Sequence, residues 1–463
     1  MLGRFINFLL VIPHTQNLKT VGAFGDITAI FAFMAFFNII LSYGMDTAYF
    51  NFIRKGHDGK QVYAISQKSI IASTVFFTAF VLLFGERSSE IMGFPGNLEY
   101  VYCCLIFLVF DTLSVMPFSR LRYEEKPLKF ALIKMANIGV NVLLNLWFLT
   151  STPEFLSGYS QVTLILLANA AASITSFMLL APLAFRINVN FDHKLLKQML
   201  QYAWPLIFVG LAGIVNETLD RNLLKRLLPS AEGSYQNGIY GAFYKLTMVM
   251  TMFVQAFRFA AVPFFFKQKE SVETRQVYAN VMYWFIGVCS FIFLSSMLFI
   301  DELARLFIKN AAYFEDKDGL YVVPILLMAN LFLGVYYNLS VWYQLSNKTK
   351  TGALVAASGA IITIVSNLVF IPAYGFVACA WITLIVYFIM CVAAYLLGHY
   401  YYKVPYYLDK YSILILSSLG LWALQNTFGS HFIVKWQQIL TNMLFLALFL
   451  LIIWMLQPKR KNA

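Results

Sequence analysis

The chain consists of long apolar runs that follow one another almost to the C-terminus, separated by short polar stretches. Runs of about 20 residues have the length of a helix that crosses ~30 Å of hydrocarbon, whereas a β-barrel shows alternating segments of ~10 residues. The pattern predicts an all-α polytopic membrane protein with about 14 transmembrane helices, the first one short. The expected spans are 2–12, 27–50, 68–84, 100–118, 130–149, 161–185, 200–219, 237–266, 279–300, 321–345, 352–371, 374–398, 411–428 and 438–456.

The span expected at 237–266 carries polar residues along one face of an otherwise apolar helix. At ~100° per residue, these residues fall within ~80° of one another. They are Asn237, Tyr240, Tyr244, Thr247, Thr251, Gln255 and Arg258. Hydrocarbon cannot solvate such a seam, so we expect it to face a water-filled cavity or another polar helix. Two interpretations stay open: the seam holds helices together by hydrogen bonds, or it lines the path of an anionic cargo.

Three further spans carry polar residues on one face. The sets are Thr28, Asn38, Ser42, Asp46 and Tyr49; Asp111, Ser114 and Arg122; and Lys134, Asn137, Asn141 and Asn145. Leu or Ala would pack between helices without the cost of desolvating polar groups, so four such spans predict a shared hydrophilic interior. Hydrogen bonding between helices is the alternative for the three Asn residues.

The ionisable residues inside spans are the candidates for binding charge. Arg4 and Arg258 are predicted to bind the cargo, because guanidinium offers a permanent, bidentate cation for phosphate; the alternative is that each reaches a nearby interface. The acidic candidates pair with these cations or couple transport to an ion. They are Asp46, Asp111 and Glu217.

Composition agrees with a membrane protein and brings in no catalytic chemistry. The chain is 60% hydrophobic and 12% charged, against about 25% charged in soluble proteins. Most of the 34 Lys and Arg residues lie on one side if the spans alternate, which predicts that both termini are cytoplasmic. The net charge of +12 then reflects topology and requires no nucleic acid. The five Cys and five His show no metal-ligand spacing, and no phosphate loop occurs, so we expect neither cofactor nor metal nor catalytic residue.

Two short matches suggest an internal repeat. Asn145-Leu-Trp-Phe-Leu ends one span and Asn367-Leu-Val-Phe-Ile ends another, in corresponding positions of the two halves. We expect a six-helix unit used twice, related about an axis along the membrane normal. The predicted divisions are 1–198 for the N-terminal lobe, 199–402 for the C-terminal lobe, and 403–463 for two appended helices with a basic tail.

Four stretches of the chain carry a resemblance to a known family: Gly3 to Val11, Tyr43 to Phe50, Asp220 to Tyr235 and Ser366 to Gly375. They resemble the Wzx-like oligosaccharide and polysaccharide flippases of the multidrug/oligosaccharidyl-lipid/polysaccharide exporter superfamily. The resemblance implies two six-helix lobes around a central cationic cavity that opens alternately to each side. It also implies that Arg4, Arg221 and Arg258 lie where the family keeps cations. This chain departs from the family in having Gln16 in place of an Arg and Thr363 in place of one of two paired Asn residues.

The function implied by this resemblance is a flippase for a polyprenyl-pyrophosphate-linked oligosaccharide, acting in assembly of O-antigen, capsule or exopolysaccharide. The implied location is the bacterial cytoplasmic membrane, and the implied partners are the lipid-linked substrate, membrane lipids and polysaccharide polymerase machinery. An ion-coupled exporter of drugs or organic cations is the alternative, since charge counting does not exclude it. A membrane glycan polymerase or ligase is a third interpretation, which the short loops disfavour because such enzymes need a substantial outer loop.

Overall fold

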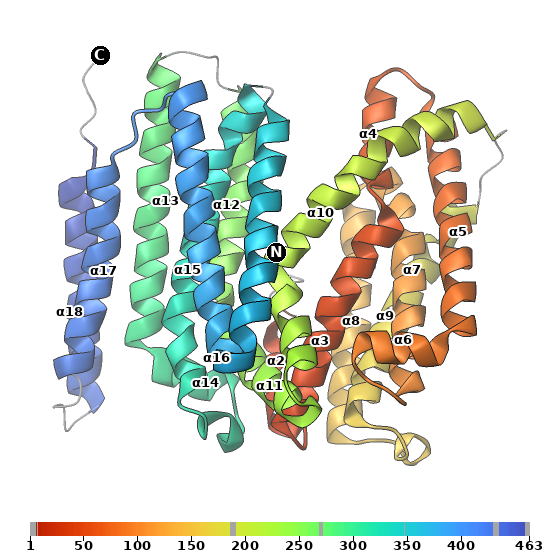
Figure 1. The fold of residues 1–463 in the computed structure, drawn as a ribbon, viewed down its shortest axis with the longest axis horizontal. Helices are drawn as coiled ribbons and strands as arrows, with labels where there is room; N and C mark the ends of the chain where they lie inside the picture. The colour runs from red at the N-terminus through yellow and green to blue at the C-terminus, as the bar shows by residue number, and fades with distance from the viewer. Residues whose placement is uncertain are drawn as a thin grey trace. The chain divides into compact units, whose positions relative to one another are not determined.

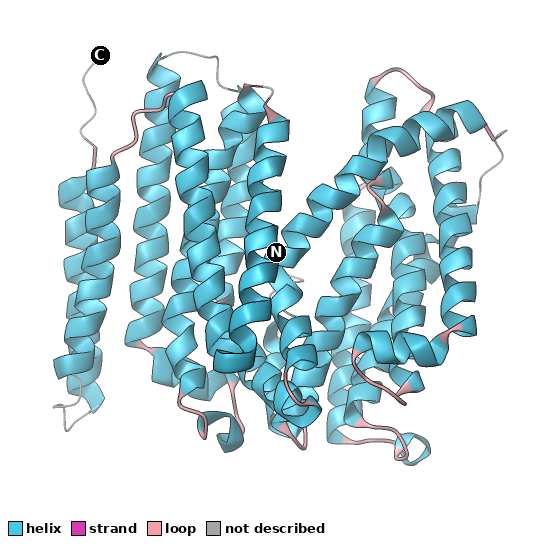
Figure 2. Ribbon diagram, in the orientation of Figure 1, coloured by secondary structure: helices cyan, strands magenta, loops and turns pink. Residues whose placement is uncertain are grey.

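The protein is built from helices, as the computed structural model shows for residues 6, 8–185, 191–267, 272–346, 348–428 and 435–458. Within these described ranges the backbone forms helices and loops and no strand (Figure 2). Ten of the described helices are long and apolar enough to cross a membrane. The predicted fold class, an all-α polytopic membrane protein, is confirmed.

The helices gather into two compact units, each described by itself. Unit 1 comprises Met1–Gly241 with Ile371–Phe376, and unit 2 comprises Ala242–Phe370 with Val377–Ala463. The helices of unit 1 are α2 (Val11–Asn17), α3 (Val21–Ser42), α4 (Met45–Arg54), α5 (Gly59–Leu83), α6 (Gly85–Met92), α7 (Leu98–Tyr123), α8 (Pro127–Thr150), η1 (Glu154–Leu156), α9 (Gln161–Phe185), α10 (His193–Leu227) and the first part of α11 (Ser230–Leu246). The helices that follow in unit 2 are α12 (Met248–Lys267), α13 (Val272–Leu298), α14 (Ile300–Phe307), η2 (Ala311–Phe314), α15 (Asp318–Leu345), α16 (Thr349–Tyr401), α17 (Leu408–Phe428) and α18 (Lys435–Leu456).

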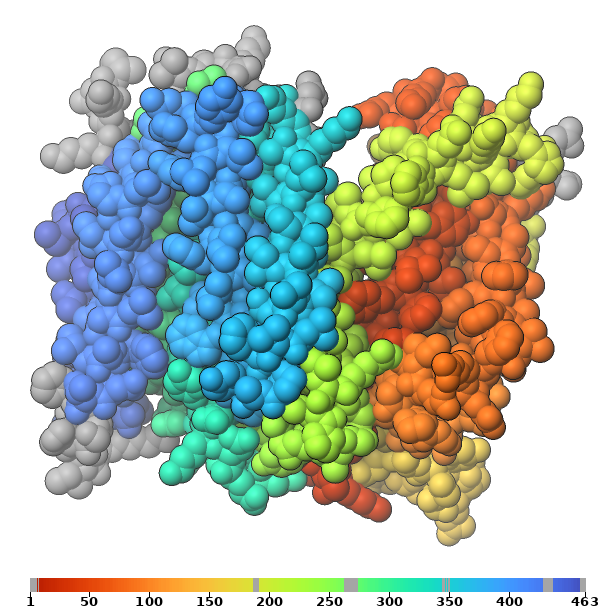
Figure 3. Space-filling view, viewed as in Figure 1, coloured from red at the N-terminus to blue at the C-terminus, as the bar shows by residue number. Residues whose placement is uncertain are grey.

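In unit 1, α7 packs against α5 and α9, and α9 also packs against α8 (Figure 1). The long helix α10 lies against α3 and α4, and the space-filling view shows its yellow-green side chains against the red α3 (Figure 3). Asp58 and Asp192 begin α5 and α10 by accepting hydrogen bonds from backbone N–H groups of the first turn, as N-cap residues do. One core cluster joins four of these helices through Met45, Ile65 and Met116, with Met199 from α10.

In unit 2, α13 is the central helix, and α15, α17 and α18 pack against it. The last two helices lie side by side (Figure 1). The spans predicted at 411–428 and 438–456 correspond to α17 and α18. The short helix α14 lies between the long helices α13 and α15 in the chain and carries Asp301, Glu302 and Arg305.

Two of the predicted spans divide in the structure, and a third extends beyond its predicted end. The span predicted at 27–50 divides at Tyr43 and Gly44, which both have left-handed φ values of 33° and 69°. The span predicted at 237–266 is wrong as one helix, because α11 ends and α12 begins around Thr247. The hydroxyl of Thr247 donates to the carbonyl of Tyr244 at 2.8 Å, and such bonds compete with the helical ladder. The helix expected to end near residue 219 continues to Leu227, so Asp220 and Arg221 lie inside α10.

The spans predicted at 352–371 and 374–398 form the two arms of α16, which bends at Gly375. This glycine has φ of 55°, and a Cβ placed on it would lie 2.0 Å from Oε1 of Gln236. The same oxygen accepts the N–H of Phe376 at 3.1 Å. Only glycine fits this bend, because any side chain would meet both an unfavourable φ and the Gln236 amide. The division into 1–198, 199–402 and 403–463 stays a prediction.

Candidate functional site

Hydrogen-bonded polar side chains form a continuous chain through three helices of unit 1. Nε2 of His14 in α2 donates to Oδ1 of Asn145 at 3.0 Å. Nδ2 of Asn145 donates to Oδ1 of Asn141 at 2.7 Å, and Nδ2 of Asn141 donates to Oδ1 of Asn169 in α9 at 3.3 Å. Asn145 is fully buried, so these bonds replace the water that its amide loses. Two of the four residues were predicted as site residues, and the other two, His14 and Asn169, were not.

A second polar group of unit 1 surrounds Asp111, one of the predicted ion-coupling residues. Oγ of Ser173 in α9 donates to Oδ1 of Asp111 in α7 at 2.8 Å. Lys134 in α8 interacts electrostatically with this carboxylate, and its ammonium also lies 4.2 Å from the ring centre of Phe118. Asn137, the third predicted Asn of α8, is half-buried. Asp111 and Ser173 therefore bond α7 to α9, and the exposed Lys134 of α8 adds an electrostatic attraction to the same carboxylate.

Asp46 faces a cation at the start of α4. Its Oδ2 lies 3.9 Å from Nη2 of Arg122, and both side chains are partly exposed, at 37% and 50%. Arg122 also donates to Oγ of Ser119 at 2.9 Å and lies over the ring of Phe50. The long, exposed ion pair is weak, so Arg122 is held mainly by the ring and the hydroxyl.

The link between α7 and α8 holds a tighter ion cluster around Glu124. Its two carboxylate oxygens accept from Nε of Arg120 and Nζ of Lys126, each at 2.6 Å. The hydrogen bond from Lys126, with that from Arg120, lowers the pKa of Glu124 below its usual range. The cluster therefore ties the turn between α7 and α8, next to the end of the apolar span Leu98–Tyr123.

The sequence prediction missed a buried ion pair between α10 and α3. Nζ of Lys225 donates to Oδ1 of Asp26 at 2.9 Å, and the two side chains are 5% and 21% exposed. Oγ of Ser234 donates to the same carboxylate oxygen at 2.6 Å and also accepts from Lys225. The ammonium lies 4.7 Å from the ring centre of Phe94. The close approach of Gly25 to the Ser234 carbonyl, where no Cβ would fit, brings α3 and α11 together here.

The charged pair Asp220 and Arg221 is also tied to α11. The hydroxyl of Tyr240 donates to Oδ2 of Asp220 at 2.7 Å, and Nδ2 of Asn237 donates to the carbonyl of Arg221 at 2.9 Å. Oδ1 of Asp220 accepts the N–H of Arg221 at 2.8 Å. Two residues of the predicted seam therefore join α11 to α10 inside unit 1.

The remainder of the seam lies in unit 2, where α12 packs against α15. Oγ1 of Thr251 donates to Oδ1 of Asn330 at 3.2 Å, and Nδ2 of Asn330 donates to the carbonyl of Leu326 at 2.9 Å. Farther along α12, the exposed guanidinium of Arg258 lies 4.3 Å from the ring centre of Tyr337. The polar face of α12 therefore bonds to α15 near its start and carries the exposed Arg258 next to the ring of Tyr337 near its end.

The other predicted residues occupy less enclosed positions. Asn38 in α3 is half-buried, as are Tyr244 and Gln255, whereas Glu217 in α10 is exposed. Arg4, together with Asn7 of the resembling stretch, lies outside the described residues. Among the described residues, no cluster of three His, Cys, Asp or Glu side chains could hold a metal ion, and the five cysteines are buried free thiols.

Comparison with known proteins identifies a family and a relative that this chain resembles in sequence. The model of a family described as "Polysaccharide biosynthesis protein" matches residues 1–269. An uncharacterized membrane protein of Methanocaldococcus jannaschii is 24% identical over 200 residues, which are 43% of this chain and 43% of that protein. This chain therefore spans less than half the length of that curated relative.

Two solved structures share the fold over most of their length. The lipid II flippase MurJ, in an inward closed conformation, is 15% identical and matches 98% of this chain and 97% of its own, with a TM-score of 0.74. A multidrug resistance MATE family transporter of the MOP superfamily, in an inward-facing conformation, is 14% identical and matches 86% of this chain and 94% of its own, with a TM-score of 0.65. The chain therefore has the fold of MurJ and of MATE transporters, and the family match confirms the resemblance to polysaccharide biosynthesis proteins seen in the sequence.

Proposed function

Since the chain belongs to the polysaccharide biosynthesis protein family, we propose that it is a transporter that flips a polyprenyl-pyrophosphate-linked oligosaccharide across the bacterial cytoplasmic membrane by alternating access. The product would supply the polymerase machinery that assembles a surface polysaccharide. The likeness in fold to MurJ, a lipid II flippase, supports a lipid-linked cargo. A flippase moves its cargo without chemical conversion, so we propose no catalytic residue.

The observation that carries the proposal is the exposed guanidinium of Arg258 in an apolar helix. A permanent charge at membrane depth must be hydrated or paired, and α12 leaves this one exposed against the ring of Tyr337. The planar guanidinium binds two phosphate oxygens at once. We propose that Arg258 holds the pyrophosphate of the cargo while Tyr337 fixes its orientation.

We choose the other proposed cargo contacts by how far each side chain is exposed. Asn38, Asn137 and Gln255 are half-buried, so their amides can meet sugar hydroxyls without breaking the bundle; Tyr244, Arg4 and Arg221 are further candidates. Asn141 and Asn145 are buried and bonded to one another. A cargo contact there requires that these bonds break, so we propose that the main role of this pair is to hold the helices together. Thr251, bonded to Asn330, has the same role in unit 2.

Substitution of Arg258 tests the proposal. In a strain lacking the chromosomal gene, the variant Arg258→Ala should abolish surface polysaccharide while the protein stays in the membrane at its normal amount. Arg258→Lys should retain part of the output, because Lys keeps the charge and loses the bidentate geometry. Arg305→Ala is the matched control, since Arg305 is an exposed Arg of the same unit on the short helix α14.

The proposal fails if Arg258→Ala and Arg258→Glu both leave polysaccharide output normal. Accumulation of lipid-linked oligosaccharide in the deletion strain, with its sugars analysed, would identify the cargo. If the deletion strain makes as much polysaccharide as the wild type and accumulates no lipid-linked intermediate, the protein carries another cargo.

An ion-coupled exporter of organic cations is the second candidate, and the exposed carboxylate of Glu217 in α10 is the observation that favours it. A cationic cargo would bind a carboxylate, and Asp111 or Asp46 would carry the coupling proton. A drug-efflux assay in a sensitive host separates the two candidates. Efflux that Glu217→Gln abolishes and Arg258→Ala leaves unchanged would establish the exporter.

A further inference from the structure

One end of unit 2 gathers aromatic rings from three helices and from the link between α16 and α17. Here α13 begins, α15 ends, α16 begins and ends, and α17 begins. The rings of Tyr278 and Tyr402 stack with centroids 6.4 Å apart, and those of Trp342 and Tyr401 stack at 5.8 Å. We call this set, with Tyr407, the aromatic end of unit 2. It joins segments that lie more than a hundred residues apart in the sequence.

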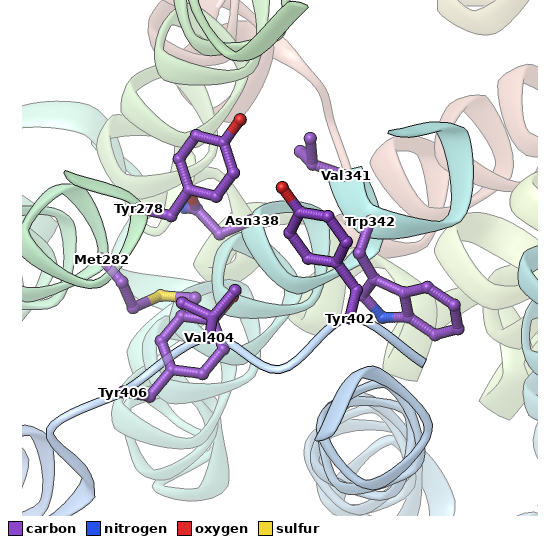
Figure 4. A pocket seen from close by; sticks show the side chains of 8 residues that line it. All are labelled: Tyr278, Met282, Asn338, Val341, Trp342, Tyr402, Val404 and Tyr406. Carbon is purple, nitrogen blue, oxygen red and sulfur yellow. The ribbon is translucent and has the colours of Figure 1, made fainter. Parts of the chain in front are cut away.

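The rings are held in place by buried contacts. Tyr278, Trp342 and Tyr402 surround a cavity of about 10 Å³ with Tyr406 and other side chains (Figure 4), which is about the space that one water molecule needs. Nε1 of Trp342 donates to the carbonyl of Ala394 at 3.1 Å. The rings that line this cavity therefore have little freedom to move.

Cations lie on these rings. Nζ of Lys348 is 3.3 Å from the ring centre of Tyr401, and Cζ of Arg275 is 4.7 Å from that of Tyr402. Nζ of Lys410 is 5.3 Å from the ring centre of Tyr407. Attraction to a neutral ring holds a cation in place and does not cancel its charge.

The charge of the aromatic end is positive. Lys350 and Lys403 are exposed beside the three ring-bound cations. Of the described side chains in segments 274–280, 342–350 and 398–411, Asp409 alone is acidic. Five basic groups against one acidic group leave an excess of positive charge, which attracts an anion.

The position of this end suits the boundary between hydrocarbon and water. The apolar spans Thr274–Leu298, Asp318–Tyr343 and Lys350–Tyr401 all begin or end here. Trp and Tyr concentrate at that boundary, and basic groups next to span ends attract anionic lipid headgroups. The exposed rings of Tyr400 and Tyr401, at 81% and 42%, offer an apolar surface next to the cations.

We propose that the aromatic end of unit 2 binds the phosphate headgroup of an anionic phospholipid of the bilayer. The cations contact the phosphate, and the exposed tyrosine rings contact the glycerol and the first part of the acyl chains. Free phosphate would use only the cations, so the rings favour a lipid. The proposal concerns the surrounding bilayer and does not depend on which cargo the protein carries.

The test uses the full-length protein in nanodiscs of phosphatidylcholine, to which phosphatidylglycerol is added as the probe. Binding is measured by native mass spectrometry and by the rise of the thermal unfolding midpoint. The triple variant Lys348→Gln/Lys403→Gln/Lys410→Gln should bind phosphatidylglycerol at least tenfold more weakly, because each basic group near the surface contributes about 1 kcal/mol. Tyr400→Ala should weaken binding by a smaller factor.

The matched control is Lys60→Gln/Lys129→Gln/Lys194→Gln, which removes the same charge from exposed positions of unit 1. It should bind phosphatidylglycerol as the wild type does. Equal loss in both triple variants would overturn the proposal, since net charge alone would then explain the binding. Displacement of phosphatidylglycerol by millimolar inorganic phosphate or pyrophosphate would also overturn it and assign the end to a soluble anion. Folding of the triple variant is checked in pure phosphatidylcholine, where its unfolding midpoint should equal that of the wild type. The single variant Lys403→Gln should show a smaller loss of binding to phosphatidylglycerol.

Discussion

Lys225 and Asp26 lie 199 residues apart in the chain and form an ion pair of 2.9 Å inside unit 1. Ser234 shares the carboxylate, and the ring of Phe94 covers the ammonium. The pair connects α10 to α3 beside the start of α11. Little water reaches it, so its partners depend on one another far more than those of a surface pair do.

We expect Asp26→Asn and Lys225→Met each to destabilise the protein by about 3 kcal/mol, since each leaves one buried charge without its counter-ion. The double variant should recover part of that loss, because no charge is then left buried. Thermal unfolding in detergent micelles measures both. Arg87→Ala is the control, since Arg87 pairs with Glu90 at the surface, with exposures of 75% and 53%, and should cost less than about 1 kcal/mol. A double variant that is no more stable than the worse single variant would contradict this account.

Asn145→Leu should cost about 2 kcal/mol of stability, because it removes the buried amide that accepts from His14 and donates to Asn141. Asn137→Leu, on the same helix and half-buried, should cost less than half as much. The ratio of the two stability losses, measured by thermal unfolding, shows how much the buried hydrogen bonds of Asn145 stabilise the protein. Equal losses would show that burial of Asn145 does not isolate its bonds from water.

Gly375→Ala should destabilise unit 1 by about 2 kcal/mol or more, because the bend of α16 needs a positive φ and leaves no room beside Gln236. Adding Gln236→Ala should relieve the collision and leave the cost of the φ value. In contrast, Gly139→Ala in α8 meets nothing within 4 Å and should stabilise by about 0.5 kcal/mol or more, since Ala favours a helix. A loss of stability in the Gly139 variant would show that its open surroundings are occupied in the membrane.

The lowered pKa of Glu124 predicts that the protein loses a small part of its stability in acid. Its pKa is lowered in the folded protein by Lys126 and Arg120, so its contribution is full above the unfolded pKa of about 4.3 and disappears as the pH falls through the folded pKa. The contribution should be below about 1 kcal/mol, because the cluster is partly exposed. Unfolding midpoints from pH 3 to 7 should therefore fall less steeply for Glu124→Gln than for the wild type. Identical slopes would exclude the cluster as the cause.

Part of the candidate site could be read from the sequence, because polar residues at helical spacing inside an apolar run are conspicuous. Asn141, Asn145 and Thr251 do bond across helix interfaces. Their partners could not be read in the same way. His14 follows the first short span, and Asn169 is a single polar residue in a run of small apolar ones; only the packing of α2 and α9 against α8 brings them to the Asn pair.

The approximate places of the apolar helices, and the membrane class of the protein, follow from the sequence by itself, because the length needed to cross hydrocarbon is a local property of the chain. The tertiary structure alone decided which polar groups meet. Asp26 with Lys225 and the division of the predicted seam at Thr247 depend on contacts between distant segments and on a backbone carbonyl that accepts the Thr247 hydroxyl. Periodicity along one helix carries no information about either, because a hydrogen bond needs its partner within about 3 Å and the sequence does not specify which helix supplies that partner.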